Sequence, residues 1–267
     1  MGHTTNSRRY TRTIMKTFRH SGTLGDLIYS LYMVKKMGGG EFKVAIENIE
    51  NCVAKYGYRP EDVDVQHQGR FTEQDYAWLK PLLERQSYVE QVSQWHQGDV
   101  EPEVDLDSYR AVLYRTFEGN ILQAYHKTFD MPFSMADYDT PWLEANVKRV
   151  KPVVITRSLR YRPPNGEEGW HNIISTGMLE NNAVFVGTPA EHADFTKTFN
   201  IVVDYYKATD FLDLASVVNG ADLVVSNQGF TYSLAIGLGK STVLEINKLV
   251  PMQINECFFP RTNCQYF

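Results

Sequence analysis

The chain has 267 residues, of which 43% are hydrophobic and 22% charged, so it can bury a globular core without metal or disulfide support. Its net charge of -5 argues against broad nucleic-acid binding, and no run of about 18 apolar residues is present to span a membrane. Cys52, Cys257 and Cys264 match no zinc spacing and are interpreted as thiols of a reducing compartment. Since the N-terminus lacks an apolar signal segment, we expect a cytoplasmic protein.

The first 20 residues are strongly basic. They contain no acid and five basic residues, namely Arg8, Arg9, Arg12, Lys16 and Arg19. Such a cluster can contact phosphates or can be a solvated tail. We favour the solvated tail because the whole chain is acidic.

The first half of the chain opens with the pattern of a βαβ unit. A strand over 13–19 is followed by a glycine turn, and Leu24, Leu27, Ile28, Leu31 and Val34 recur at helical spacing. Glycines 38–40 end this helix, and 41–48 is a second strand. The following segments predict a helix over 72–86, a strand over 87–95, one or two helices over 107–130 and a further helix over 141–147.

The alternation restarts at residue 151 and is clearest there. Apolar strands are predicted over 151–158, 182–189, 200–206, 222–229 and 241–247, with helices over 211–221 and 230–239. This order predicts an α/β fold with doubly wound parallel sheets. We expect two Rossmann-like domains, 1–150 and 151–267, with the boundary near 148–152 and a central cleft between them.

The turn "HSGTLGD" (20–26) joins the first strand to the first helix. It lacks both the GxGxxG dinucleotide motif and the P-loop motif. Gly22 and Gly25 allow a tight turn and close approach of a ligand. Asp26, in the first helical turn, fits two interpretations: an acid favoured by the helix dipole, or a carboxylate that accepts a proton from a hydroxyl.

Three later turns also follow predicted strands. "TRSLRYR" supplies Arg157, Arg160, Tyr161 and Arg162, and arginine forks suit diphosphate oxygens. Three arginines within six residues after a core strand favour this interpretation over an exposed loop of solvated arginines. Gly187 lies in "VGTPAEH". In "SNQGFTYSLA", Gly229 lets a phosphate approach the backbone N–H groups beside Asn227 and Gln228, whereas Thr231 can be a plain helix cap.

The last predicted strand ends in a carboxylate. Glu245, in "VLEIN", can hold ribose hydroxyls as acids do in nucleotide-binding folds, or it can pair with a lysine such as Lys248. Trp170, in "GEEGWHNI", is interpreted as a structural anchor rather than a ligand-binding residue.

These segments together resemble a known family. "SGTLGDLIYSL" resembles the opening "SSxGDxxxTLPAL" of the ADP-heptose lipopolysaccharide heptosyltransferases, which are GT-B glycosyltransferases. "FVGTPAEH" resembles their "GGPxE" segment, and "DFLDLASVVNGADLVVSNQGFTYSLAIGLGKSTVLE" resembles their "DTGxxHxAAAxGxP" run. The resemblance covers about 14–40 and 151–247.

The resemblance implies residue roles and a reaction. Asp26 matches the proposed catalytic base, within an acceptor loop that includes Ser21, Gly22, Thr23 and Gly25. Asn227, Gln228 and Gly229 match the turn that binds the donor diphosphate. This chain has Asn227 where the family has aspartate and Tyr232 where it has histidine, so the donor sugar stays open.

The implied reaction transfers a sugar from a nucleotide-diphosphate sugar to an acceptor hydroxyl, with inversion and without an obligatory metal or other cofactor. The sequence leaves the acceptor open between a glycan, a lipid-linked molecule and a modified DNA base, and it does not specify the oligomeric state.

Three alternatives were weighed. A GT-A enzyme needs a metal-binding DxD, and the candidates at 62–64, 105–107 and 137–139 follow no apolar strand. A viral-type glycosyltransferase of hydroxymethylated DNA bases would suit the basic N-terminus but not the acidic total. A protein that binds nucleotide or sugar without turnover is the third.

Overall fold

The computed structural model describes residues 15–46, 71–113, 119–163, 166–247 and 257–267. The first sheet is parallel and four-stranded in the order β3-β2-β1-β4. Its strands are β1 Thr17–His20, β2 Gly40–Ala45, β3 Val89–Trp95 and β4 Val104–Asp105. The helical segments of this half are α1 Leu24–Lys36, α3 Glu73–Glu84, η3 Leu106–Ser108, α4 Tyr109–Leu113, α5 Ile121–Thr128 and α6 Ala136–Asp139.

The second sheet is parallel and six-stranded in the order β10-β9-β8-β5-β6-β7. Its strands are β5 Val153–Thr156, β6 Ala183–Val186, β7 Asp204–Tyr206, β8 Leu223–Asn227, β9 Ser241–Glu245 and β10 Cys264–Tyr266. The helices of this half are α7 Gly166–Ser175, α8 Pro189–Phe199, α9 Phe211–Gly220 and α10 Phe230–Gly237. This strand order is that of a doubly wound dinucleotide-binding fold, as the alternation predicted.

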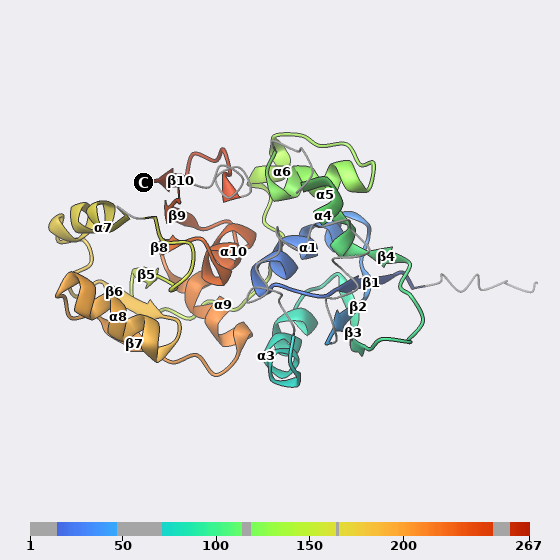
Figure 1. Cartoon of the computed structure of the whole chain (residues 1–267), viewed down its shortest axis with the longest axis horizontal. Coiled ribbons are helices and arrows are strands. Elements are labelled where there is room, and N and C mark those ends of the chain that lie inside the picture. Colours follow the sequence, from blue (N-terminus) through green and yellow to red (C-terminus); the bar gives the residue numbers. More distant parts are fainter. Residues whose placement is uncertain (1–14, 47–70, 114–118, 164–165, 248–256) are drawn as a thin grey trace, which may run out of the picture.

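Side chains alternate between the two faces of the second sheet. Val153 and Ile155 pack into a cluster with Trp170 of α7 and with Phe195 and Phe199 of α8. Val154, between them, belongs to the larger core that also contains α9, α10 and α1. Both faces are therefore covered by helices, which explains why the strands read as continuous apolar runs. In Figure 1, α7 and α8 lie on the outer side of this sheet, and α9 and α10 lie toward the first half of the chain.

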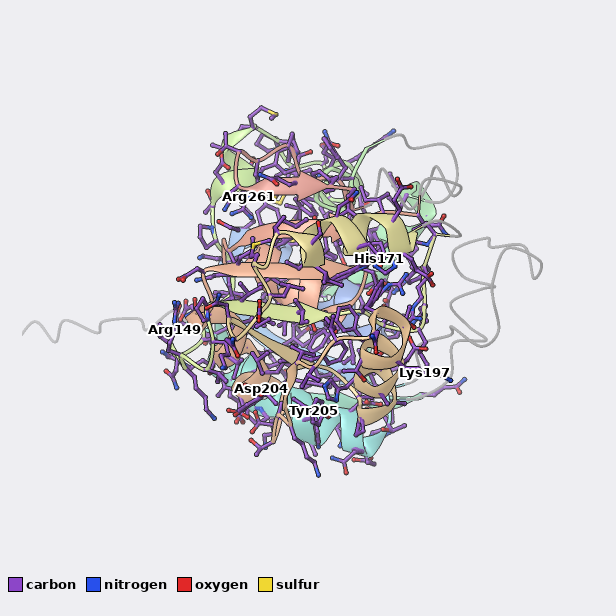
Figure 2. The ribbon with its side chains drawn as sticks, turned by 90° about the vertical axis from the view of Figure 1, so that its left-hand side faces the viewer. Arg149, His171, Lys197, Asp204, Tyr205 and Arg261 are labelled. Carbon is purple, nitrogen blue, oxygen red and sulfur yellow. The ribbon has the colours of Figure 1, made fainter. Side chains whose placement is uncertain are left out.

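Figure 2 looks at the second sheet from this outer side. Arg261, just before β10, lies near one edge of the sheet, and Asp204 and Tyr205 of β7 lie near the other. His171 of α7 and Lys197 of α8 both lie to the right of the centre of the view, with Lys197 lower. The residues of β7 and β10 thus lie at opposite edges, as the strand order requires, and α7 and α8 cover the same face of the second sheet.

The two halves are held together chiefly by helices. The helix α1 packs against α10, and α3 packs against α9, so that one core is continuous between the two sheets (Figure 1). Gly25 of α1 approaches α10 so closely that an added Cβ would lie 2.9 Å from Ser233 Oγ. Described strands before residue 106 form one sheet and those after 152 form the other. The predicted boundary at 148–152 lies between these groups and stays a prediction.

The prediction of a helix over 141–147 is wrong. This stretch has no regular secondary structure, and the backbone N–H groups of Trp142 and Leu143 both donate to the Gly237 carbonyl, at 2.9 Å each. The Trp142 indole N–H donates to the Ile28 carbonyl at 2.9 Å. These hydrogen bonds tie the segment to α1 and α10, so its backbone groups are satisfied without a helix of their own.

Several predicted ends also shift. The first strand begins at Thr17 rather than residue 13, and α7, α8 and β10 were not predicted. Cys257 is buried and Cys264 is half-buried, whereas Cys52, Arg8, Arg9 and Arg12 and the triplet at 62–64 lie outside the described residues. In the described part of the chain, no helix is both long enough and apolar enough to cross a bilayer.

Candidate active site

The predicted turns lie where the strand order of each sheet reverses. In the first sheet β1 has β2 on one side and β4 on the other, and in the second sheet β5 lies between β6 and β8. In open parallel sheets, ligands bind at the carboxyl ends of the strands at such a reversal. The turn 21–23 follows β1 and the segment from Leu106 follows β4. The turns at 157–162 and 228–229 follow β5 and β8.

Asp26 lies in the first turn of α1 and is partly exposed, with 16% of its side chain accessible. Its Oδ2 lies 3.4 Å from the Thr23 amide and accepts a hydrogen bond of 2.9 Å from Arg110 Nη2. Among the described residues, no hydrogen bond to its other oxygen, Oδ1, was found. Asp26 is therefore both the helix-start acid and a carboxylate with one oxygen available, so its two interpretations are compatible.

Arg110, which sequence reasoning missed, holds this turn from the neighbouring strand end. It also donates to Asp107 Oδ1 and to the Gly22 carbonyl, in addition to Asp26. Asp107 is fully buried, and its Oδ2 accepts the Ser21 amide at 3.0 Å. Gly22 has a φ of +123°, a backbone conformation that a side chain rarely tolerates, which explains glycine here. The strand that delivers Arg110 and Asp107 has only two residues, too few to give a periodic signal.

His20 lies beneath the turn and is fully buried. Its Nδ1 accepts the Gly22 amide at 3.1 Å, while Nε2 lies 3.7 Å from Asp107 Oδ1. Burial lowers the pKa of His20 to about 4, although the nearby Asp107 opposes this shift. The imidazole is neutral at pH 7, as its role of accepting an amide N–H at Nδ1 requires.

This buried histidine predicts a loss of stability in acid. The folded-state pKa lies below the unfolded value of 6.5, so the unfolded chain binds the proton first as pH falls from 6.5 toward 4. The matched variant is His20→Asn, whose amide oxygen can replace Nδ1 as acceptor. Between pH 7 and pH 4.5, the free energy of unfolding in urea should fall by about 2–3 kcal/mol more in the wild type than in His20→Asn. Equal losses of unfolding free energy in both proteins over this interval would contradict the assignment of a neutral, buried His20. Between pH 7 and pH 8, His20 should not change the stability of either protein.

On the second sheet, Asn227 joins two of the predicted turns. Its Oδ1 accepts the Ser158 amide at 2.8 Å, and its Nδ2 donates to the carbonyls of Ser158 and Arg160 at 3.1 and 2.7 Å. Asn227 is 1% exposed, so it acts as a buried clamp on the 157–162 turn. The structure thus brings together the residues predicted from "TRSLRYR" and "SNQG".

The 157–162 turn also positions Arg160 and Tyr161. Tyr161 has a left-handed backbone with a φ of +56°, and Arg160 Nη2 donates to its hydroxyl at 2.7 Å. Arg160 Nε is buried and has no hydrogen-bond partner among the described residues. Gln228 and Gly229 are half-buried, and Gly229 caps α10 without a side-chain hydrogen bond. Unpaired donors at a helix start are suited to an anion.

Arg157 and Glu245 form a buried ion pair, and their predicted roles toward diphosphate and ribose stay predictions. Arg157 donates to both oxygens of Glu245, with Nε 2.9 Å from Oε2 and Nη2 2.8 Å from Oε1. Trp170, fully buried as an anchor, donates its indole N–H to Glu245 Oε2 at 2.9 Å. The Glu245 side chain is completely inaccessible, and the pair reaches from β5 to β9 across β8. These residues stabilise the end of the sheet.

Tyr232 and Gly187 make contacts of other kinds. Tyr232 is fully buried and donates its hydroxyl to the Cys257 carbonyl at 2.8 Å, and its predicted donor role stays a prediction. Gly187, at the end of β6, has a φ of +135° and its carbonyl accepts the Tyr205 hydroxyl at 2.9 Å. It leads directly into Thr188, the cap of α8.

The two predicted halves of the site meet where α1 and α10 begin. Gly25, next to Asp26, packs against Ser233 in the first turns of α10, whose cap is Gly229. A hollow of about 260 Å³ lies elsewhere, and its lining residues are Asn146, Lys148, Asp210, Leu212, Asp213 and Ser216. The predicted cleft between the two halves stays a prediction.

The described DxD triplets are occupied by cationic side chains. Asp105 pairs with Arg19 at 2.8 Å and Asp107 pairs with Arg110, while Asp137 lies 2.5 Å from Lys36 Nζ. Within the described ranges, no group of three or more metal-ligating side chains is found. Asp107 and Asp137 are buried, so these two carboxylates are not the solvated acids of a surface turn.

Comparisons with known proteins identify the fold. No family model and no curated protein matches the chain. The crystal structure of the glycosyl transferase family 9 from Veillonella parvula DSM 2008 matches with a TM-score of 0.56 and 9% identity, over 95% of this chain and 86% of that one. E. coli heptosyltransferase WaaC with ADP matches with a TM-score of 0.49 and 12% identity, over 94% of this chain and 92% of that one.

E. coli ADP-heptose lps heptosyltransferase II matches with a TM-score of 0.48 and 9% identity, over 95% of this chain and 90% of that one. At 9% identity, the match with the Veillonella structure, whose TM-score is 0.56, shows a shared fold and no more than that. The match with the Veillonella structure and the two parallel sheets confirm the predicted fold class. The chain has the α/β architecture of a GT-B glycosyltransferase, with two doubly wound Rossmann-like sheets.

Proposed function

We propose that this chain is a glycosyltransferase that moves a sugar from a nucleotide-diphosphate sugar to an acceptor hydroxyl. The observation that carries the proposal is the contact between the start of α1, which holds Asp26, and the first turns of α10, which follow the Asn227 clamp. A base for the acceptor and an anion-binding turn for the donor are the two parts that such a transfer needs.

The proposed reaction is a direct displacement. Asp26 takes the proton of the acceptor hydroxyl, whose oxygen attacks C1 of the donor sugar. The bond from C1 to the diphosphate oxygen breaks on the opposite face, so the configuration at C1 inverts. The charge of the leaving diphosphate is met by the N–H groups at the start of α10 and by Arg160, so the proposal requires no metal.

The acceptor stays open within this proposal. A glycan, a lipid-linked molecule and a modified DNA base all supply a hydroxyl. The basic residues that favoured DNA, Arg8, Arg9 and Arg12, lie outside the described residues. Binding without turnover is the competing function, and replacing Asp26 separates it from catalysis.

A donor screen tests the proposal and the Asn227 clamp together. We expect thermal shift with ADP-heptose, UDP-glucose, UDP-N-acetylglucosamine, GDP-mannose and the free nucleoside diphosphates to identify one stabilising donor, because a ligand of the folded state raises Tm. Asn227→Ala should weaken that donor's affinity by roughly tenfold or more, since it removes four hydrogen bonds that shape the 157–162 turn.

The matched control for this screen is Asn219→Ala. Asn219 also donates its amide to a backbone carbonyl, that of Ala145 at 2.9 Å, but it lies on α9. Its loss should leave the donor affinity unchanged. Equal weakening in both variants, or no stabilising donor in the screen, would argue against the proposed donor site. Release of nucleoside diphosphate with an acceptor present, unaffected by EDTA, would support metal-independent transfer.

A further inference from the structure

Arg110 connects three acceptors around the turn that precedes α1. Its Nη2 donates to the Asp26 carboxylate at 2.9 Å and also to the Gly22 carbonyl, while its Nη1 donates to Asp107. Only 11% of the Arg110 side chain is accessible. A guanidinium fork held at three points has little freedom to change rotamer.

Asp107 provides the buried end of this arrangement. Its side chain is completely inaccessible, and its two oxygens accept from different partners, Arg110 at Oδ1 and the Ser21 amide at Oδ2. Both Asp107 and Arg110 follow β4, whereas Ser21, Gly22 and Asp26 follow β1. The contacts therefore fasten the end of one strand to the end of its neighbour at the point where the sheet order reverses.

From this geometry we infer that Arg110, supported by Asp107, is the positioning residue of the proposed base. It holds Oδ2 of Asp26 and leaves Oδ1 for the acceptor hydroxyl, and it keeps the 21–23 turn in place. The inference rests on the proposed function for its catalytic consequence, but the anchoring of the turn can be measured without any substrate.

Hydrogen exchange tests the anchoring. In Arg110→Ala and in Asp107→Asn, the amides of Ser21 and Thr23 should exchange roughly tenfold faster or more than in the wild type, because the acceptors of these amides are no longer held. The matched control is Arg149→Ala. Arg149 likewise donates to a carboxylate, of Asp222, and to a backbone carbonyl, of Gly220, but far along the chain from this turn. Unchanged exchange at Ser21 and Thr23 in both test variants would overturn the inference.

Kinetics with the donor identified by the screen test the catalytic consequence. Arg110→Ala should lower kcat roughly 100-fold, since misplacing a reacting group by about 1 Å has this effect, with KM for the acceptor nearly unchanged. Added guanidinium should restore part of the rate, and Arg110→Lys should lie between alanine and wild type. Arg149→Ala should keep the wild-type kcat.

The outcomes separate the two proposals. A raised acceptor KM with normal kcat, or a lowered kcat without faster exchange, would show that Arg110 contacts substrate rather than positions Asp26, and would overturn the inference. A wild type that transfers no sugar from any donor in the screen would refute the proposed function, and the exchange rates would still decide whether Arg110 holds the turn.

Discussion

Asp26→Asn is expected to lower the rate of sugar transfer by about 10²–10⁴-fold while donor binding is retained. The amide keeps the size of the carboxylate and can still accept from Arg110, but it cannot take up the acceptor proton. Because the proposed donor site is formed by Asn227 and the start of α10, the donor-induced rise in Tm should equal that of the wild type. Initial rates of nucleoside diphosphate release measure the effect.

A control on another helix separates the chemistry of Asp26 from its effect on helix stability. Asp75 of α3 occupies the same place in a capping box, where its Oδ2 accepts the Thr72 amide at 2.8 Å. Asp75→Asn should therefore show any capping effect on Tm without a change in rate. If transfer survives in Asp26→Asn, Asp26 is not the base. If donor binding occurs and neither protein shows turnover, the chain is a binding protein.

Glu245→Ala should destabilise the protein by about 3–5 kcal/mol, because it leaves the Arg157 guanidinium buried without its counter-charge. The Arg157 side chain is 2% accessible and Glu245 is inaccessible, so water cannot replace the lost carboxylate. The substitution also removes the partner of the Trp170 indole N–H. Urea unfolding at pH 7, followed by circular dichroism, measures the change in the free energy of unfolding.

An exposed ion pair of similar geometry provides the comparison. Arg149 donates to both oxygens of Asp222 at 2.6 Å, but these side chains are 50% and 67% accessible. Asp222→Ala should leave the unfolding midpoint almost unchanged. The double variant Arg157→Met with Glu245→Leu should recover much of the lost stability, since it removes both buried charges together. A loss below about 1 kcal/mol for Glu245→Ala would contradict the buried-pair interpretation.

Local patterns in the sequence were sufficient for most of the second sheet. The segments that became β5, β6, β8 and β9 were predicted because strands covered by helices on both faces read as apolar runs. The amphipathic α8 was missed between β6 and β7, although Thr188 and Glu191 form a capping box there. That capping box was the signal that could have found it.

The middle of the chain was harder for a physical reason. The two-residue strand β4 is too short to show periodicity, and the segment 141–147 forms no helix while Trp142 and Leu143 donate their backbone N–H groups to α10. The local sequence alone does not determine the structure of either segment. Both are decided by partners more than 80 residues away along the chain, such as Phe18 for Val104 and Gly237 for Trp142.

The sequence by itself determined the α/β class, the glycine turn before α1, and the candidates Asp26, Asn227, Gln228 and Gly229, because glycines, caps and apolar runs act through near neighbours. Only the tertiary structure decided what each polar side chain does. Arg157 and Glu245 satisfy one another in the core, and Tyr232 donates to a buried carbonyl. Arg110 reaches Asp26 because parallel strands place distant segments side by side, and buried charges bind whichever partner that arrangement brings within reach.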